Sequence, residues 1–400
     1  MDNELYWVWL TSKKTMKANK ITSLLEKFNT VEEIYAEKAF LNVPNIGSRE
    51  FGELKDKSLT AAKKIIEETH KAGAYIITFD DERYPNKLKN IANPPYILYC
   101  RGDFINVDDI LTIAVVGTRR VTDYGRIVTS RLSRDLAKSG AVVVSGMARG
   151  VDTIAAKNAL KTGAKTIAVL GCGIDIVYPS ENGGVMQDIA NNGMVITEYA
   201  PGSPPIANHF PERNRIIAGL SNGVLVTDAP KGSGSLITAK IASENGRDVF
   251  AVPRGILDEN SGANRIIQQG AKLVMSCSDI IEEYPYMERV EVKLDNDTEN
   301  ELLSEAPNSD LEDISEPADF AEHADAGSSA VKDDSDFDFS GLSDGEREIA
   351  EKLALKDMQI DELASELDTA VGTLNTRLTL LEVKGVVKKL PGGFYKINTL

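Results

Sequence analysis

The strongest constraint on the fold is a regular alternation between short apolar runs and longer amphipathic runs. Six short runs rich in Val, Ile and Leu lie at residues 110–117, 141–146, 166–173, 194–199, 223–229 and 248–253. Amphipathic runs such as 125–140 and 151–164 separate them. Continuous apolar strands joined by helices are typical of a parallel sheet that is covered on both faces. The pattern predicts a doubly wound, Rossmann-like α/β domain.

The chain has 400 residues, which is enough for more than one domain. Residues 1–75 carry helix-period apolar patterns at 20–28, 30–43 and 58–73, with a tight turn at 42–48. Residues 341–400 read as three helical runs and a short two-strand element around "PGG", which is the layout of a winged helix. We therefore predict an N-terminal helical domain, a Rossmann-like domain over residues 76–290 and a C-terminal winged helix.

The net charge of −16 is concentrated in one segment. Residues 291–340 hold 17 acidic residues and 2 lysines, so the rest of the chain is close to neutral. Low hydrophobicity and high net charge predict that residues 291–340 form an acidic disordered linker. The acidity does not argue against a polyanionic ligand for the other parts of the chain.

Several classes of protein are disfavoured by the composition. No apolar run approaches the ~18 residues of a membrane helix, and the first residues, "MDNELYWVWL", do not resemble a secretory signal. The three cysteines and three histidines are scattered without metal-ligand spacing. We expect a cytoplasmic protein with no membrane partner, no metal and no cofactor.

Each predicted strand is followed by a loop rich in Gly, Ser, Thr or Arg. The backbone N–H groups of such loops and neighbouring arginines suit phosphate groups. Because the carboxyl ends of parallel strands meet at one edge of a sheet, these loops are expected to converge there. The candidate phosphate-binding residues are Gly117, Thr118, Arg119, Arg120, Ser145, Gly146, Arg149, Gly150, Arg213, Arg215, Lys231, Gly232, Ser233, Gly234 and Ser235.

These residues also have structural interpretations. Gly146 and Gly150 are suited to close packing of a helix on a strand, and Arg213 and Arg215 are equally suited to pairing with surface acids. Asp152 is interpreted as a helix cap rather than as a catalytic group. The combination of cations and phosphate-type loops at one edge nevertheless favours a binding site.

Signals of catalysis are weak. No Gly-x-Gly-x-x-Gly follows the first parallel strand, and "GSGSL" at 232–236 lacks the Lys-Thr ending of an ATP-binding P-loop. His209 is interpreted as a structural histidine, because no Ser or Cys nucleophile is spaced to form a relay with it. The sequence therefore indicates a binding surface rather than a reaction centre.

At these residues the chain resembles the DNA-processing protein A family (DprA, also called Smf). The resemblance covers residues 76–281 and rests on six ordered motifs. They are "YPNKLKNIANPPYILYCRGD", "VVGTRRVTDYG", "SGMARGVDTIAAKNAL", "GCGIDIVYPSEN", "TEYAPGSPPIANHFPERNRIIAGLS" and "KGSGSLITAKIASENGRDVFAVP". The N-terminal helices, similar to a SAM or helix-hairpin-helix domain, and the winged-helix tail also fit the family's architecture.

The resemblance implies a protein without catalytic turnover that binds single-stranded DNA. The family protects incoming strands during natural transformation and helps load the RecA recombinase, and it acts as a homodimer formed through the Rossmann-like domain. The resemblance also implies that the loop around Arg119 and the turn after Lys231 contact the strand. Preference for single strands requires flat side chains on which bases stack. Phe210, Tyr124 and Tyr178 are the candidates, with core packing as the alternative for each.

Two residues depart from the family pattern. Arg254 precedes Gly255 where the family commonly places Gly directly after "FAVP", which changes the local turn and adds a charge. Asn45 stands where the turn of a helix-hairpin-helix usually has Gly. The turn at 42–48 is therefore a weak candidate for a DNA contact.

Two other functions stay open at this point. One is a nucleotide-processing enzyme built on the same sheet, for which Glu198 and Glu212 are the carboxylates to test. The other is a regulator that senses a small nucleotide and signals through the winged helix. The tail holds 10 acidic and 8 basic residues, and its recognition run at 370–385 combines Arg377 and Lys384 with Glu382. This balance favours a protein-interaction role or weak DNA binding for the tail.

Overall fold

The computed structural model describes residues 2–40, 42–258, 261–292, 342–356, 358–367, 369, 371–384, 386–389 and 394–397. The chain divides into two compact units, Met1–Asp310 and Leu311–Leu400, and each is described by itself. All but residues 291 and 292 of the predicted acidic linker lie outside the described residues. The finer division into four parts stays a prediction.

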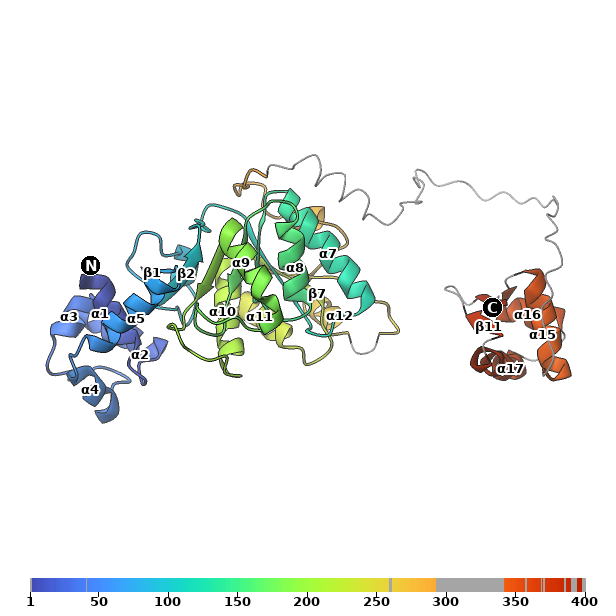
Figure 1. Cartoon of the computed structure of the whole chain (residues 1–400), viewed down its shortest axis with the longest axis horizontal. Coiled ribbons are helices and arrows are strands. Elements are labelled where there is room, and N and C mark those ends of the chain that lie inside the picture. The colour runs from blue at the N-terminus through green and yellow to red at the C-terminus, as the bar shows by residue number, and fades with distance from the viewer. Residues whose placement is uncertain are drawn as a thin grey trace. The chain divides into compact units, whose positions relative to one another are not determined.

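The first unit contains one large sheet with helices around it (Figure 1). Its strands are β1 (Tyr75–Thr78), β2 (Ile97–Gly102), β3 (Thr112–Gly117), β4 (Val142–Ser145), β5 (Thr166–Val169), β6 (Met194–Thr197), β7 (Gly223–Asp228), β8 (Asp248–Ala251) and β9 (Lys272–Leu273). Its helices are α1 (Asp2–Thr11), α2 (Ala18–Phe28), α3 (Val31–Ala36), α4 (Ser48–Lys55), α5 (Thr60–Lys71), α6 (Asn86–Lys89), α7 (Asp123–Lys138), α8 (Val151–Leu160), α9 (Gly183–Asn192), α10 (His209–Leu220), α11 (Gly234–Glu244), α12 (Gly262–Gln268) and α13 (Ser278–Ile281), with a 3-10 turn at Ser180–Asn182.

The sheet confirms the predicted doubly wound class. Its strand order is β1-β2-β6-β5-β4-β3-β7-β8-β9, and the six predicted strands are β3 to β8. Neighbouring strands from β6 to β9 in this order pair in parallel. The expectation of a parallel sheet is incomplete, because β1 and β2 add an antiparallel edge next to β6.

The order of the strands places a topological switch between β3 and β7. From β3 the chain proceeds outward through β4, β5 and β6, and it then returns to the other side of β3 with β7. The loops that leave the carboxyl ends of β3 and β7 therefore diverge and open a crevice between them. Ligands of open α/β sheets bind in such a crevice.

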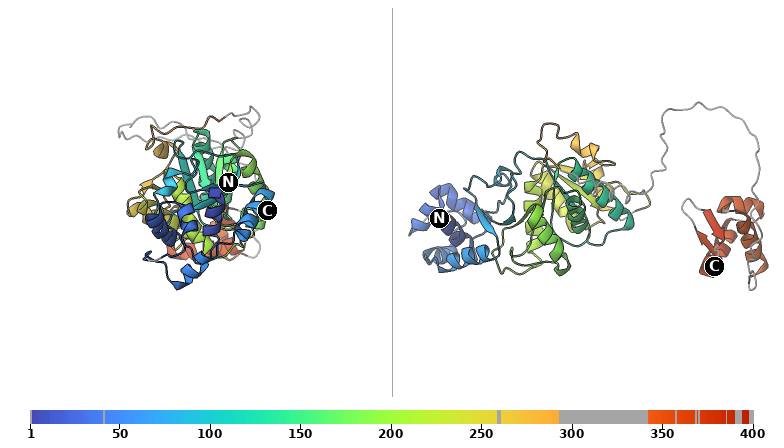
Figure 2. Two further views of the ribbon diagram at one scale, coloured as in Figure 1. Left: turned by 90° about the vertical axis from the view of Figure 1, so that its left-hand side faces the viewer. Right: turned by 45° about the horizontal axis from the view of Figure 1, so that its top comes forward.

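Helices cover both faces of the sheet (Figure 2). Successive side chains of a strand point to opposite faces of the sheet, so alternate residues of β3 pack against the helices on one face or on the other. Ile113 and Val115 share a core with residues of α7 and α8, whereas Ala114 and Val116 share a core with residues of α10 and α11. The strands are apolar at every position for this reason.

The N-terminal helices share a core with one end of the sheet. Trp7 and Trp9 are 2% and 1% exposed and pack in the same cluster as residues of β1, β2 and β6. Trp7 Nε1 donates to Asp80 Oδ1 at 2.8 Å, just after β1. Helix α1 was not expected, because four consecutive buried residues, Trp7 to Leu10, hide the helical period in the sequence.

The other N-terminal predictions hold in part. Helices α2 and α5 confirm the helical patterns at 20–28 and 58–73, but the helix expected over 30–43 ends at Ala36, and α4 was missed. The tight turn at 42–48 is present. Asn45 has a φ of 63°, in the left-handed region that Gly and Asn tolerate best, and its amide donates to Ser23 Oγ at 3.0 Å. The side-chain hydrogen bond explains why asparagine can stand in this turn.

The second unit has the predicted winged-helix layout. Its helices are α15 (Asp344–Leu355), α16 (Ile360–Glu366) and α17 (Val371–Val383), and its strands are β10 (Met358–Gln359), β11 (Val387–Lys389) and β12 (Phe394–Ile397). The strands form an antiparallel sheet in the order β10-β12-β11. Leu353, Leu363, Leu374 and Leu378 pack with Tyr395 in the core of this unit.

An ion pair joins α15 to the residue that follows α17. Lys384 Nζ lies 2.8 Å from Glu346 Oε1, and the Glu346 carboxylate also accepts from Ser343 in a capping box. The hydrogen bond from Lys384 is the main cause that lowers the pKa of Glu346 from 4.5 to about 2.

We predict that Lys384→Met returns the pKa of Glu346 toward 4.5. Because the folded pKa is depressed, the pair stabilises the unit above pH 4.5 and loses its effect as the pH falls toward 2. The Lys384→Met variant should lack this stabilisation both above pH 4.5 and between pH 4.5 and about 2. NMR titration of the Glu346 carboxyl carbon measures the shift, and Lys356→Met, which breaks an exposed pair with Glu362, is the control. An unchanged titration in Lys384→Met would refute the assignment.

Candidate functional site

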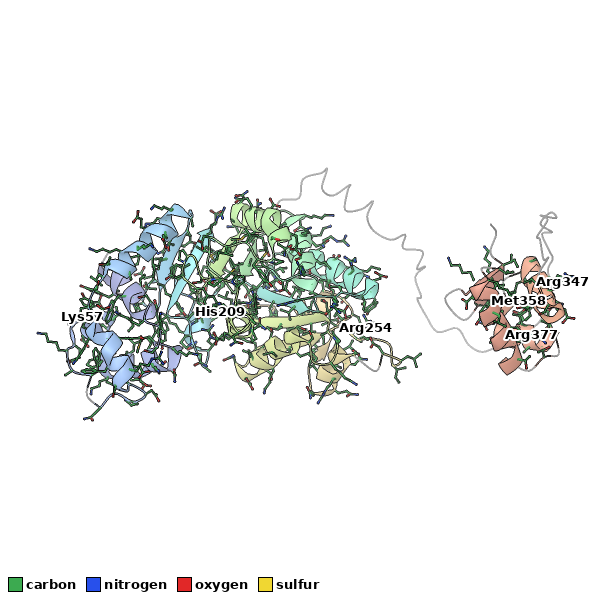
Figure 3. All side chains as sticks on the ribbon, turned by 60° about the horizontal axis from the view of Figure 1, so that its bottom comes forward. Lys57, His209, Arg254, Arg347, Met358 and Arg377 are labelled. Carbon is green, nitrogen blue, oxygen red and sulfur yellow. The ribbon has the colours of Figure 1, made fainter. Side chains whose placement is uncertain are left out.

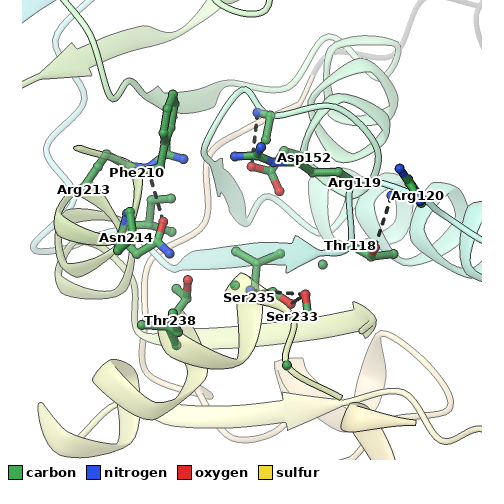
Figure 4. Close-up of a pocket in the computed structure, with 18 of the residues that line it drawn as sticks. Thr118, Arg119, Arg120, Asp152, Phe210, Arg213, Asn214, Ser233, Ser235 and Thr238 are labelled. Carbon is green, nitrogen blue, oxygen red and sulfur yellow. Dashed lines mark hydrogen bonds between the residues drawn. The ribbon is translucent and has the colours of Figure 1, made fainter. Parts of the chain in front are cut away.

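A cleft of about 640 Å³ lies at the topological switch between β3 and β7 (Figure 4). Its walls come from the loop after β3, the loop before α11 and the first turns of α10 and α11. Ten of the fifteen predicted phosphate-binding residues line this cleft. They are Gly117, Thr118, Arg119, Arg120, Arg213, Lys231, Gly232, Ser233, Gly234 and Ser235.

The start of α11 forms one wall. Gly232 has a φ of 79°, which turns the chain into the helix without strain because glycine lacks a Cβ. Ser233 caps α11: its hydroxyl lies 2.8 Å from Ser235 Oγ and accepts from the backbone N–H of Ser235. The first turn of a helix has N–H groups without intrahelical partners and carries the positive end of the helix dipole. This wall of the cleft therefore favours an anion.

The loop after β3 forms the opposite wall, and glycine makes its position possible. Thr118 N–H donates to Asp228 O at 2.7 Å, and Thr118 O accepts from Val151 N at 3.2 Å. Gly150 has a φ of 79°, and a Cβ there would lie 2.8 Å from the backbone of Arg119. A larger residue at Gly150 would push the Arg119 loop away from the sheet.

Three cations of the cleft are available to a ligand. Arg120 and Lys231 are exposed, and the Arg119 guanidinium lies over the Phe210 ring at 5.5 Å. Within the described part of the chain, none of the three forms an ion pair with a carboxylate. A cation–π contact on an accessible ring is weak, about 0.5–1 kcal/mol, so a phosphate can draw Arg119 away from Phe210.

The other predicted cations have protein partners. Arg149 pairs with Glu181, and Arg215 Nη2 lies 2.6 Å from Glu198 Oε2. Arg215 lines a separate cavity of about 430 Å³ next to α2, together with Glu198 and Glu212. Arg215 is thus on the far side of α10 from the cleft at the switch point.

Arg213 lies beneath the cleft and is only 3% exposed. Its Nη1 donates to Gly146 O at 2.6 Å and also to Val169 O. These carbonyls end β4 and β5, so one guanidinium ties two strand ends to α10. A Cβ at Gly146 would overlap this guanidinium, which explains the glycine.

Asp152 completes the buried layer under the cleft. It is 7% exposed, and its carboxylate accepts from Gly146 N at 3.2 Å and from Ala148 N at 3.3 Å. Burial raises the pKa of Asp152, and the charge of Arg213 opposes that shift. The interpretation of Asp152 as a helix cap is wrong: the N-cap of α8 is Gly150, and the Asp152 carboxylate, inside the first turn of α8, binds the N–H groups of the preceding loop instead.

The remaining predicted residues have distinct places. Ser145 is buried and donates to Val115 O at 2.9 Å. Phe210 and Tyr178 both line the cleft, with ring centroids 5.3 Å apart. Tyr124 does not line it: its ring lies under the Arg254 guanidinium at 4.9 Å. Whether any of the three rings stacks on a base stays a prediction.

Three residues in or near the cleft were not among the binding residues predicted from the sequence. Asn214 and Thr238 line the cleft, one helical turn after Phe210 and Ser235. The helical period of α10 and α11 is the signal that identifies them. Arg254, noted only as a departure, donates to Asp258 Oδ2 at 3.0 Å and to Thr122 Oγ1 at 2.8 Å. It fixes the turn after β8 against the start of α7.

The described residues hold neither a metal site nor a membrane-spanning helix. No three His, Cys, Asp or Glu side chains lie together in an arrangement that could hold a metal ion. Within the same residues, no helix is both long and apolar enough to span a membrane.

A doubly wound sheet with a cation-lined cleft at its switch point, in a chain that also carries a winged helix, is typical of proteins that bind nucleotides or nucleic acids. The family model for DNA recombination-mediator protein A matches residues 46–285, and that for the DprA winged helix domain matches residues 338–393. The chain therefore belongs to the DNA recombination-mediator protein A family, as the sequence motifs indicated.

The chain is similar to several individual DprA proteins. DNA processing protein DprA of Streptococcus pneumoniae is 44% identical over 207 residues, which is 52% of this chain and 73% of that protein. The X-ray structure of DprA from the same species has a TM-score of 0.63 at 35% identity and covers 70% of this chain and 97% of that chain. A structure of DprA from Helicobacter pylori, described for its single-stranded DNA binding mode, is 36% identical over 54% of this chain and 97% of that chain, with a TM-score of 0.49.

We predict that Arg213→Met lowers the stability of the first unit, whereas Arg119→Met does not. Arg213→Met leaves the carbonyls of Gly146 and Val169 buried without this donor, at about 1–3 kcal/mol each. Arg119 loses only an accessible contact with Phe210. Urea unfolding followed by tryptophan fluorescence compares the two variants. Equal stability of Arg213→Met and the unaltered protein would contradict the structural role of Arg213.

Proposed function

We propose that the cleft at the switch point binds single-stranded DNA without regard to sequence. The observation that carries the proposal is the set of three cations, Arg119, Arg120 and Lys231, around the N-terminus of α11, none of which has a carboxylate partner among the described residues. These groups neutralise phosphates, which are the same in every sequence. Membership of a family named for recombination mediation favours DNA over a free nucleotide.

The cations are spread over two walls rather than focused on one point. Arg119 and Arg120 follow β3, whereas Lys231 follows β7. Two separated positive walls fit successive phosphates of a strand better than the phosphate of one nucleotide. Phe210 and Tyr178 line the same cleft, so an unstacked base bound there can stack on a flat ring.

We further propose that the protein acts by binding and has no catalytic turnover. The Asp152 carboxylate lies at the floor of the cleft, where it accepts hydrogen bonds from the N–H groups of Gly146 and Ala148. The two carboxylates considered for catalysis, Glu198 and Glu212, line the second cavity with Arg215. A general acid or base has to reach the reacting atom, and Glu198 and Glu212 do not line the cleft.

We propose the cellular role that the resemblance to the family implies. In this proposal the protein is cytoplasmic, protects incoming single strands in natural transformation, and helps load RecA onto them. It acts as a homodimer through the Rossmann-like domain. Two clefts in one dimer would give avidity for a long strand, since the second contact is intramolecular.

A mononucleotide sensor or enzyme is the competing function. The capped N-terminus of α11 supports it, because a helix start of this kind also holds a single phosphate. Competition distinguishes the two: a mononucleotide displaces a ligand from a one-phosphate site but not from a cleft that holds several phosphates.

We predict that Arg119→Glu and Lys231→Glu each weaken binding of a labelled thymidine oligomer at least about tenfold, or about 1.4 kcal/mol. Each variant should also flatten the dependence of log K on log salt by about 0.7 for each lost contact. Fluorescence anisotropy at several salt concentrations measures both effects, and other sequences should respond equally.

Lys138→Glu is the matched control, because Lys138 is an exposed lysine at the opposite end of α7 from the cleft. Its affinity should stay close to that of the unaltered protein. Unchanged binding in Arg119→Glu and Lys231→Glu, or displacement of the oligomer by a mononucleotide, would count against the strand-binding function.

A further inference from the structure

The tail is nearly neutral overall, but its acidic and basic residues are concentrated in different parts of it. Residues 341–382 contain all ten acidic residues of the tail, whereas residues 383–400 contain four lysines and no acidic residue. The basic end is the part that forms β11 and β12, the strands of the wing. The tail is therefore acidic over its helices and basic over its wing.

In the recognition run, which a winged helix usually places in a duplex, both basic side chains contact another helix of the same unit. Lys384, next to the end of α17, is paired with Glu346 of α15. Arg377, labelled in Figure 3, packs against Gly345, where an added Cβ would overlap its guanidinium. Both basic side chains of the recognition run thus contact the start of α15.

The outer face of the wing sheet has the opposite character. Lys388 of β11 lies directly opposite Lys396 of β12, and both are exposed. Phe394 is on the same face, two residues before Lys396, and is 38% exposed. The intervening Tyr395 points to the core and is 4% exposed.

Such a face is unfavourable in the absence of a ligand. Like charges directly opposite each other on a sheet destabilise it, and an exposed aromatic ring gains nothing from water. An anionic strand relieves both costs, because its phosphates neutralise the lysines and an unpaired base stacks on the ring. Base–aromatic stacking contributes about 1–3 kcal/mol per base.

We propose that the outer face of the wing, formed by Lys388, Phe394 and Lys396, is a second binding site for single-stranded DNA, separate from the cleft in the first unit. The choice of DNA as ligand rests on the proposed function. The exposed ring favours a single strand over a duplex, whose bases are already stacked. A second site on the same chain adds affinity for strands long enough to occupy both.

Photo-cross-linking of the full chain tests the site directly. An oligomer containing 5-iododeoxyuridine is irradiated with the protein, and the adducts are mapped by mass spectrometry. The expected result is an adduct on Phe394 that is lost in Lys388→Glu/Lys396→Glu and is not displaced by duplex DNA. Absence of an adduct on Phe394, or its displacement by duplex as readily as by single strand, would overturn the proposal.

Binding measurements separate the two sites. Lys388→Glu/Lys396→Glu should weaken binding of a long oligomer several-fold and lower the salt slope by about 1.4, or 0.7 per contact. The matched control is Lys352→Glu/Lys356→Glu, which reverses two charges that are exposed and paired on the same unit. Equal effects of the two double variants would refute the wing site.

The two proposals fail in different ways. If Arg119→Glu abolishes binding and Phe394 gives no adduct, the cleft functions alone and the wing site is wrong. If Arg119→Glu has no effect while the Phe394 adduct persists, the wing binds DNA and the function proposed for the cleft is wrong.

Discussion

The pairing of β3 with β7 is the constraint on which the rest of the first unit depends. These two strands are adjacent in the sheet but are separated in the chain by three strands and their crossovers. Because the chain moves away from β3 in one direction and returns on the other side, the loops after the two strands part. The crevice between them receives the Arg119 loop from one side and the start of α11 from the other.

The arginines of this unit have two different roles, and their burial decides which role each one has. Arg213 is buried and satisfies the carbonyls at the ends of β4 and β5, whereas Arg119 lies on an accessible ring and has no carboxylate partner among the described residues. A buried guanidinium with fixed partners cannot leave them for a ligand without orphaning polar groups. Arg213 therefore holds the floor of the cleft in place, and Arg119 is available to bind.

In the winged-helix unit, too, protein partners decide which basic side chains are available to a ligand. Its recognition run contains two cations, but the pairing of Lys384 with Glu346 and the packing of Arg377 on Gly345 direct them to α15. Lys396 faces solvent because the two-residue period of β12 sends Tyr395 and Ile397 inward, and Lys388 of β11 lies opposite it. The two cations of the recognition run thus contact α15, whereas Lys388 and Lys396 are exposed on the wing.

The sequence by itself determined the class of the sheet, six of its strands and ten residues of the cleft, because continuous apolar strands and glycine-rich loops are local patterns. It also determined the family, through six ordered motifs. It did not reveal α1, whose consecutive buried residues lack a helical period, nor the antiparallel strands β1 and β2. The partners of the cations were decided only by the tertiary structure. Arg119, Arg213 and Arg215 are alike in the sequence, and they differ because folding brings Phe210, two strand-end carbonyls or Glu198 to each guanidinium.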